Sequence, residues 1–458
     1  MRSPLLAVCV LFLMPTLAAA APAVPTPVST TSSAPQSISK SALPWIEDDY
    51  AAAIAKGRAQ HVPVFVEVWA PWCHTCRSMK AYVFTDPSLQ RHAQDVVWLD
   101  LDTENPRNAA FRRKYPCEVL PTMFVIDPVR EQATLRWIGG ATIAQMHTLL
   151  DDVHAGGGAA PALLTKVASA DSAFGTGDNA AAAQAYQTVL AGAPADWRGR
   201  DRILESLMYA YSRTHQHKDA VALATRELPG LGRSLSAMNV ASLALDAAVA
   251  LADSVPTAPQ ADAIRALVTS GTALVRDTSF AAAADDRSGE YISLLGATDA
   301  LHDTAAGKAV AAEWAAYLEG QAARAKTPDQ RAVFDSHRFA AYLELGQPER
   351  SLPMLLASER DLPDDYNPPA RLANTYKALK RWDEALAASD RAMAKSYGPR
   401  RLLIYQTRID IYEGKGDKAA ARRTLEEAIR YAEALPEGQR SNNMIAGLRK
   451  RLTGMATS

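Results

Sequence analysis

The sequence predicts an α/β domain followed by an all-α helical solenoid. Three observations lead to this fold class. Residues 64–68 form an apolar, largely β-branched run typical of a buried strand, and the Cys-His-Thr-Cys segment that follows at 73–76 begins a helix. Alanine is used heavily from about residue 160 onward, which favours helix. In that second half, similar residues recur every 34 positions, a period typical of stacked helix pairs.

The N-terminal segment is predicted to lie outside the folded part of the protein. A positive charge at Arg2 precedes an apolar stretch at 5–17 and a run of small residues at 18–23, which is the order found in secretory signal peptides. A membrane anchor is the alternative, but the apolar stretch is short for a span. We therefore expect a cleaved signal peptide at 1–20, a disordered Pro/Ser/Thr/Ala-rich tether at 21–42, and a periplasmic location.

Length, charge and cysteine content narrow the function. The chain has 458 residues, enough for two or three domains. Its formal net charge of -1 gives no reason to expect nucleic acid or an anionic membrane as a partner. Cys9 would leave with the signal peptide, so Cys73, Cys76 and Cys117 would remain. Three cysteines do not make a disulfide-stabilised scaffold, so we expect one redox pair and one further thiol.

The α/β domain is expected over residues 43–154. Helix starts are marked by Asp or Asn, followed twice by Pro at the first helical position. The predicted elements are, in order, a helix to Gln60 capped by Asp48 or Asp49, a strand at 64–68, the redox helix at 73–79, a short helix from Asp86, a strand at 96–101, a helix at 105–115, strands at 123–126 and 133–138, and a helix at 142–153.

Several motifs give this region a family resemblance. They are Phe-Val-Glu-Val-Trp-Ala-Pro-Trp-Cys at 65–73, Cys-Arg-Ser-Met at 76–79, Tyr-Val-Phe-Thr-Asp-Pro at 82–87, Leu-Pro-Thr at 120–122 and Trp-Ile-Gly-Gly-Ala at 137–141. Together they resemble a thioredoxin-fold domain and, more narrowly, the carboxy-terminal domain of DsbD-type membrane disulfide reductases and their soluble relatives. The resemblance covers about a quarter of the chain. It implies thiol–disulfide chemistry but does not identify the electron source, because nothing in the sequence matches the membrane-spanning part of such reductases.

Cys73 and Cys76 are the predicted redox pair. A cysteine at a helix N-terminus is favoured as a thiolate by the backbone N–H groups, and a second cysteine one turn later can close a small disulfide ring. We expect Cys73, at the exposed mouth of the motif, to attack a substrate disulfide, and Cys76 to resolve the mixed disulfide. A zinc half-site would need further ligands. Covalent haem attachment is excluded because Arg77 stands where that motif requires His. No metal or cofactor is expected.

Two further positions take their predicted roles from the resemblance. Glu67 lies in an otherwise apolar strand, where related domains place a buried carboxylate, and would accept the proton of Cys76. A solvent-facing side chain is the alternative. Pro121 would be a cis proline facing the disulfide, which leaves the neighbouring backbone free to pair with an extended substrate. A trans proline at a strand edge is the alternative there.

The residues around the cysteines are expected to tune the pair. Trp72 would flank and shield the dithiol. A protonated His74, or a hydroxyl hydrogen bond from Thr75, would stabilise the Cys73 thiolate and make the pair more oxidising. Exposed, uncoupled side chains are the alternative for both. Cys117 is expected to be a buried, inert thiol, with a resolving or regulatory thiol as the alternative.

The second half, expected over 163–454 after a glycine linker at 155–162, resembles a tetratricopeptide-like solenoid. The repeats are clearest over 335–435, and a last amphipathic helix is expected at 441–452. No catalytic constellation is found in this half, and the repeat positions are read as core. Its concave surface is of the kind that binds a peptide or protein. Residues separated by the 34-residue period include Tyr342 and Tyr376, Leu345 and Leu379, and Ser351, Ala385 and Ala419.

The sequence therefore predicts an exported thiol–disulfide oxidoreductase that acts on proteins with disulfides or thiols, with reduction slightly favoured over oxidation. A membrane or soluble electron donor and a protein partner at the helical half are implied. The alternative is a non-catalytic periplasmic adaptor in which both halves only bind other proteins.

Overall fold

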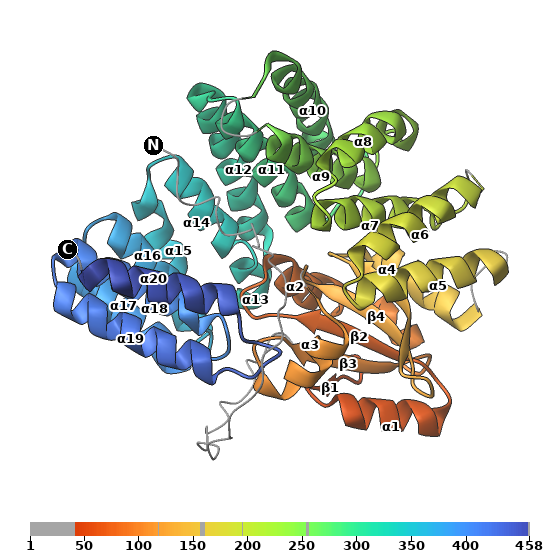
Figure 1. Cartoon of the computed structure of the whole chain (residues 1–458), viewed down its shortest axis with the longest axis horizontal. Helices are drawn as coiled ribbons and strands as arrows, with labels where there is room; N and C mark the ends of the chain where they lie inside the picture. The colour runs from red at the N-terminus through yellow and green to blue at the C-terminus, as the bar shows by residue number, and fades with distance from the viewer. Residues whose placement is uncertain (1–41, 118, 156–160, 195, 253–255, 457–458) are drawn as a thin grey trace.

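A computed structural model describes residues 42–117, 119–155, 161–194, 196–252 and 256–456. The expected signal peptide, nearly all of the expected tether and most of the expected linker lie outside these residues. Within them, an α/β domain is partly enclosed by an arc of helices that begins beside it, passes over it and returns to its other side (Figure 1). None of the helices in these ranges is both long enough and apolar enough to cross a membrane.

The α/β domain is built on a five-stranded mixed sheet with the strand order β1-β3-β2-β4-β5. β1 and β2 pair with β3 in parallel, whereas β4 is antiparallel to β2 and to β5. The central strand β2 is buried along its whole length, in keeping with a sequence that is apolar except for Glu67. The strands are β1 (Ile46–Glu47), β2 (Val64–Trp69), β3 (Val97–Asp102), β4 (Thr122–Asp127) and β5 (Gln132–Ile138).

Helices cover both faces of this sheet. Alternate residues of β2 point to opposite faces: Val66 packs with α1 and α3, whereas Phe65 packs with the redox helix, its continuation and α4. The predicted helices starting near 86 and 105 begin as 3-10 turns. The elements are α1 (Tyr50–Gln60), α2 (His74–Ser78), the π-helical turn η2 (Met79–Val83), the 3-10 turns η3 (Pro87–His92) and η4 (Pro106–Asn108), α3 (Ala109–Lys114) and α4 (Ile143–Ala155).

The second domain is all-helical, and each helix packs against its neighbours in the chain (Figure 1). The helices are α5 (Pro161–Gly175), α6 (Asn179–Gly192), α7 (Arg200–Arg213), α8 (His217–Leu231), α9 (Leu235–Leu251), α10 (Ala258–Arg276), α11 (Ala284–Ala300), α12 (Thr304–Arg324), α13 (Pro328–Ala332), α14 (Asp335–Glu344), the 3-10 turn η5 (Pro348–Arg350), α15 (Ser351–Asp361), α16 (Asn367–Ala378), α17 (Trp382–Lys395), α18 (Arg401–Lys415), α19 (Lys418–Ala434) and α20 (Asn442–Ala456).

The fold class predicted from the sequence, an α/β thioredoxin-like domain followed by a tetratricopeptide-like solenoid, is confirmed. The 34-residue period is visible in the starts of α16 and α18, at Asn367 and Arg401. One core assignment is wrong. Ala385 is buried, but Ala419 is exposed and its place in the core is taken by Ala420 and Ala421, because the start of α19 has drifted relative to α17.

The two domains are in direct contact along several elements. α5 lies against β5, the last strand of the sheet. There the backbone N–H of Arg136 donates to a carboxylate oxygen of Asp171 at 3.2 Å, and its carbonyl oxygen accepts from the Arg202 guanidinium at 2.7 Å. On the other side of the molecule, a Cβ at Gly438 would collide with the carbonyl oxygen of Ala109. The backbones of the two domains are therefore in direct contact at Gly438 and Ala109.

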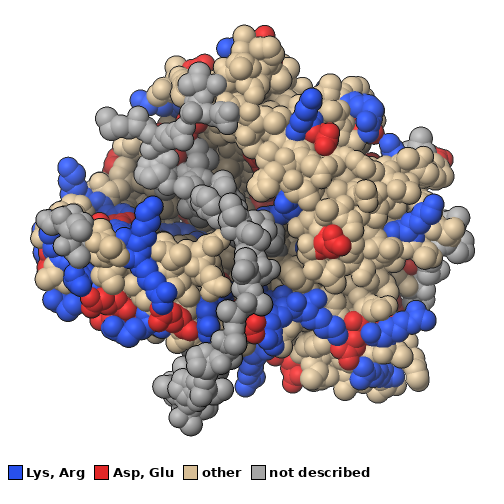
Figure 2. Space-filling model, in the orientation of Figure 1, with Lys and Arg blue, Asp and Glu red and all other residues tan. Residues whose placement is uncertain are grey.

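Charged side chains of both signs are interspersed over the face seen in Figure 2. This distribution accompanies a formal net charge of -1 for the whole chain. Only two large apolar side chains of the described residues stand out from the surface, Val129 and Leu356.

Candidate active site

Cys73 and Cys76 form a disulfide at the start of α2, with an S–S distance of 2.11 Å and a Cα–Cα distance of 5.2 Å. Cys73 is the N-cap of the helix, and its sulfur accepts a hydrogen bond of 3.1 Å from the backbone N–H of Cys76. The same N–H would stabilise a thiolate on Cys73 in the reduced state. The arrangement can therefore exchange two electrons with another dithiol or disulfide.

The expectation of an exposed mouth at Cys73 is wrong. Only 5% of Cys73 and none of Cys76 is accessible to solvent. Trp69, Ala70, Trp72 and Leu120 pack directly around the two cysteines. This burial could not be predicted from the sequence of the α/β domain, because residues of the helical domain lie over the outer side of the cysteine pair.

The cover is formed by α13, the start of α14 and the loop before α16. Asn367, the first residue of α16, donates its side-chain N–H to the carbonyl oxygen of Pro71 at 3.1 Å. Asp365 forms a buried ion pair with Arg77, with Nη1 and Oδ2 2.5 Å apart. On α11, Asp285 accepts a hydrogen bond of 2.6 Å from the hydroxyl of Ser78. The carbonyl group of Pro71, just before the redox helix, and the side chains of Arg77 and Ser78 on it thus have partners in the helical domain.

Trp72 joins the two domains on the remaining side. Its indole N–H donates to Glu104 at 2.8 Å, and the Arg400 guanidinium lies 4.5 Å from its ring centre. Glu104 also accepts from the backbone N–H of Arg400 at 2.6 Å. Tyr397 donates its hydroxyl to Asp102 at 2.6 Å. Trp72 flanks the dithiol as expected, but it is itself held from outside the α/β domain.

Glu67 is fully buried, so the solvent-facing alternative is wrong. Its carboxylate lies 3.4 Å from Nζ of Lys80, and Lys80 also ion-pairs with Asp100 and lies 4.1 Å from the centre of the Trp69 ring. Burial raises the pKa of Glu67 to about 8, opposed by the attraction of Lys80 and reinforced by the repulsion of Asp100. Glu67 can therefore exchange a proton near neutral pH.

The peptide bond between Leu120 and Pro121 is cis. Leu120 packs against the cysteine cluster, and the carbonyl oxygen of Pro121 accepts from the backbone N–H of Gly139 at 2.9 Å. β4 begins with the next residue, Thr122. The segment therefore lies beside the disulfide, where the resemblance placed it.

His74 is not exposed, so the exposed alternative is wrong, and its surroundings disfavour the protonated form that was expected. The residue is 8% exposed, and its ring nitrogen Nδ1 lies 2.5 Å from the carbonyl oxygen of Val333. Burial lowers the pKa of His74 to about 3. The hydrogen bond to Val333 opposes this shift, and the positive charges of Arg371 and Arg77 lower the pKa further. Thr75 is partly buried, and its side chain is turned toward Asp285 of α11 rather than left uncoupled.

Cys117 is buried and outside the disulfide, as expected of an inert thiol. Its thiol donates to the carbonyl oxygen of Tyr115 at 3.2 Å. Among the residues that the structure describes, no group of three or more His, Cys, Asp or Glu side chains is arranged to hold a metal ion.

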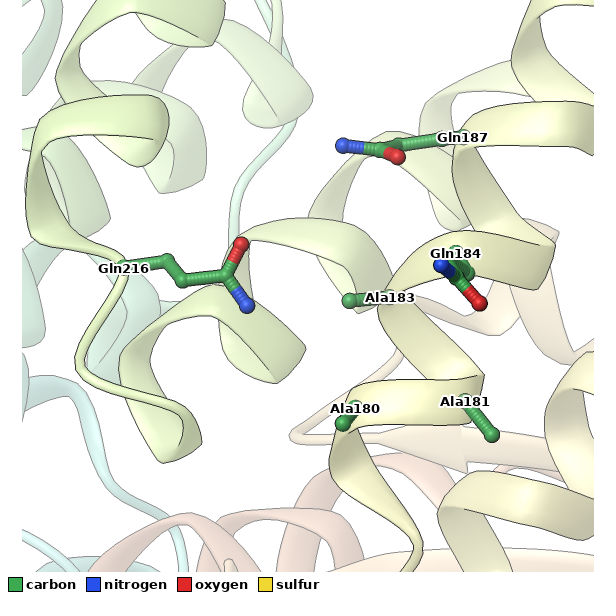
Figure 3. A pocket seen from close by; sticks show the side chains of 6 residues that line it. All are labelled: Ala180, Ala181, Ala183, Gln184, Gln187 and Gln216. Atoms are coloured by element: carbon green, nitrogen blue, oxygen red, sulfur yellow. The ribbon is translucent and has the colours of Figure 1, made fainter.

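A cavity of about 410 Å³ lies elsewhere, between α6 and the loop before α8 (Figure 3). It is lined by the side chains of Ala180, Ala181, Ala183, Gln184, Gln187 and Gln216. These are small or neutral groups that carry no proton-transfer or nucleophilic chemistry. The cavity is not part of the redox site.

A thiol–disulfide pair at the start of a helix, on a mixed sheet of this topology, defines a thioredoxin-like redox domain. The comparisons with known proteins agree. Residues 45–128 match the thioredoxin-like family model. The same region is similar to the thiol:disulfide interchange protein DsbD of Pseudoalteromonas atlantica, 32% identical over 82 residues, which are 18% of this chain and 14% of that protein. It is also similar to DsbD of Salmonella paratyphi A, 28% identical over 128 residues, or 27% of this chain and 22% of that protein.

The chain thus spans less than a quarter of the length of these relatives. Among solved structures, a tetratricopeptide repeat protein from Parabacteroides merdae aligns with 64% of this chain and 100% of its own, at 11% identity and a TM-score of 0.42. The sequence matches and the Cys73–Cys76 pair support a thiol–disulfide redox role for the N-terminal domain.

Several residues of the site were not singled out from the sequence. Lys80 carried one available signal, since it is a lysine one helical turn after Cys76. Arg77 belongs to the Cys-Arg-Ser-Met motif, but nothing in that motif indicates a partner for its charge. Asp365 and Val333 offered no signal, because nothing in a single sequence relates a loop of the helical half to the redox motif.

Proposed function

We propose that this protein is an exported, periplasmic thiol–disulfide oxidoreductase whose Cys73–Cys76 pair reduces disulfides in protein substrates. The observation that carries the proposal is the disulfide closed at the N-terminus of α2, with Glu67 and Lys80 buried in the same domain. The helical domain would recruit or position a protein partner. Export rests on the sequence pattern of the first 20 residues.

Each turnover would move two electrons from the protein to the substrate. The Cys73 thiolate attacks one sulfur of a substrate disulfide, and the second substrate sulfur leaves and takes up a proton. Cys76 then gives up its proton and attacks the sulfur of Cys73, which releases the first substrate sulfur as a thiol. The Cys73–Cys76 disulfide remains, and a dithiol donor in the membrane or in solution would reduce it by the same exchange.

Glu67 is the group we assign to the proton of Cys76. Its pKa of about 8 lies close to the ordinary thiol pKa of about 8.5, so a proton passes between the two at little free-energy cost. Lys80 follows Cys76 by four residues, about one helical turn, and its positive charge favours the ionised form of Glu67.

A protein substrate would need the helical cover to move. With 5% of Cys73 accessible, an extended peptide has no room beside the sulfur. The contacts of Asp365 and Asn367 with the redox segment would have to open before attack and close afterwards. We therefore assign the described arrangement to a closed, oxidised state of the cycle.

Reduction of insulin with a chemical dithiol as electron source tests the activity. Wild type should accelerate the reaction, Cys73→Ser should lose at least about 100-fold in rate, and Cys76→Ala should accumulate mixed disulfides with substrate. Cys117→Ala is the matched control, since it removes a buried thiol outside the pair. Equal turnover by wild type and Cys73→Ser would end the proposal.

Equilibration with glutathione tests the direction. A potential near about -270 mV supports a reductase, and one near about -120 mV supports an oxidant. A binding-only adaptor is the second candidate function, and the deep burial of Cys73 is the observation that favours it. An adaptor would retain its partners in pull-down experiments with Cys73→Ser and would show no turnover with either form.

A further inference from the structure

We propose that His337 of the helical domain is a positioning residue for the redox site. It stacks on His74, which stands between the two cysteines in sequence, and keeps that imidazole buried in its neutral form, while the carbonyl group of Val333 fixes which ring nitrogen carries the proton. The inference rests on the proposed thiol–disulfide function and adds the means by which the helical domain sets the redox potential of the pair.

His74 is fixed from two sides, by Val333 in the segment that joins α13 to α14 and by His337 in the first turn of α14. Its Nδ1 lies 2.5 Å from the carbonyl oxygen of Val333. A carbonyl oxygen can only accept, so Nδ1 carries the proton and donates it. The ring centres of His74 and His337 are 3.7 Å apart with an interplanar angle of 26°. Nε2 of His74 is buried without a hydrogen-bond partner in the described residues, so nothing there would stabilise a second proton.

His337 is itself held in place by two residues. Trp314 donates its indole N–H to the hydroxyl oxygen of Ser288 at 2.7 Å. The hydroxyl hydrogen of Ser288 is then available for Nδ1 of His337, which lies 2.7 Å away. In this arrangement the proton of His337 is on Nε2 and its ring is neutral. Two rings stacked at this distance repel strongly if both are charged.

The two arginines beside the stack, Arg77 of the redox helix and Arg371 of α16, also disfavour a positive charge on His74. Burial is the main reason that the pKa of His337 lies well below its ordinary value. Asp335 of α14 is the negative group nearby in sequence, and it acts on both arginines. His74 therefore stays neutral over the range in which thiols titrate.

A neutral His74 affects the redox pair in a defined direction. An imidazolium next to Cys73 would stabilise its thiolate, favour the dithiol form and make the pair more oxidising. With a neutral ring that stabilisation is missing, so the disulfide form is relatively favoured and the pair is more reducing. The helical domain thus shifts the pair toward the reductase direction through His337.

The test is the equilibrium constant with glutathione, defined for oxidation of the dithiol protein, in full-length variants. His337→Ala would let water reach His74 and allow it to protonate. We expect this constant to fall at least tenfold, which corresponds to about 30 mV for a two-electron couple. His337→Phe keeps an uncharged ring on His74 and should stay within about threefold of wild type. An unchanged constant in His337→Ala would overturn the proposal.

A double-mutant cycle separates positioning from a general packing effect. In a His74→Phe background, His337→Ala should no longer alter the constant, because no imidazole is left to protonate. A loss of packing would shift the constant equally in both backgrounds, and that outcome would also overturn the proposal.

Nitrogen-15 NMR of the wild-type chain provides a readout that needs no variant to fold. His74 should show the neutral Nδ1–H tautomer throughout pH 5–8. Titration of its ring within that range would contradict the inference. These results are distinct from failure of the proposed function, which would appear as the absence of turnover while the His74 tautomer remained as described.

Discussion

Arg77 of the redox helix and Asp365 of the helical domain form a buried ion pair, although 288 positions separate them in the sequence. Both side chains are at most 7% exposed. Asp365 also accepts hydrogen bonds from the backbone and side-chain N–H groups of Asn367. Because Arg77 directly follows Cys76, this pair ties the position of the redox helix to that of the helical domain.

Removing one partner of this pair should loosen the cover. Asp365→Ala would leave the Arg77 charge buried and unpaired, which costs about 3 kcal/mol of stability. We expect the reduced variant to react with iodoacetamide at Cys73 about tenfold faster than wild type. Asp383→Ala is the matched control, because its carboxylate pairs with Lys415 inside the helical domain and away from the cover. Equal rates for the two variants would show that the ion pair does not control access.

Replacing the buried carboxylate should slow the second chemical step. Glu67→Gln keeps the shape of the side chain but cannot accept a proton, so resolution of the mixed disulfide by Cys76 should slow about 100-fold. In wild type the rate should rise as pH increases toward 8, because a pKa of about 8 means that the basic form of Glu67 grows over this range. In the variant the rise should move to higher pH and follow the thiol alone. Quench-flow trapping of the intermediate measures both effects.

The exposed Glu47 of β1 gives the control for that experiment. Glu47→Gln removes a carboxylate from the same sheet without touching the buried Glu67–Lys80 pair. Its rate and pH profile should match those of wild type. A similar slowing in both variants would mean that the net charge of the domain matters rather than Glu67 itself.

Asp102, at the domain interface, should make stability depend on pH. Burial is the main cause that raises its pKa to about 8, against the hydrogen bond from Tyr397. The folded state therefore binds this proton more tightly than the unfolded state, whose ordinary value is 3.8. Its contribution to stability is complete below about pH 4 and is lost as pH rises toward 8. In wild type the free energy of unfolding therefore decreases as pH rises, and Asp102→Asn should reduce this decrease by at most about 1.4 kcal/mol per pH unit.

Urea unfolding at pH 5 and pH 8 measures this slope. Asp262 of α10, whose side chain is 76% exposed, gives the control. Asp262→Asn should leave the slope as it is in wild type. If Asp102→Asn also left it unchanged, other buried carboxyl groups would account for the whole pH dependence.

A single methyl group should separate the domains on the α20 side. Gly438→Ala would place a Cβ against the carbonyl oxygen of Ala109, and no flexible side chain can yield there. We expect a loss of about 1–3 kcal/mol, measured as a lower unfolding temperature. Gly447→Ala, in α20, meets open space and should instead stabilise the helix by up to about 1 kcal/mol. A loss of stability in Gly438→Ala together with a gain in Gly447→Ala would identify the close approach to Ala109, rather than the added methyl group itself, as the cause of the loss.

Local features of this fold could be predicted from the sequence because neighbouring residues determine them. The Asp49 cap of α1, the apolar strand β2 and the pairing of cysteines three positions apart are of this kind. β1 could not be predicted, since two residues show no periodicity. The burial of the disulfide and the partners of His74 depend on contacts across about 260 positions, which no local pattern encodes.

The contacts that α5 and α7 make with β5 have a consequence for the α/β domain in isolation. The main-chain groups of Arg136, at the outer edge of the sheet, are occupied by Asp171 and Arg202. At the opposite edge, β1 is only two residues long. Cutting the chain after α4 would uncover a strand edge able to recruit a second copy, so that fragment would be prone to self-association and aggregation. The helical domain thus protects the α/β domain as a solubilising shield.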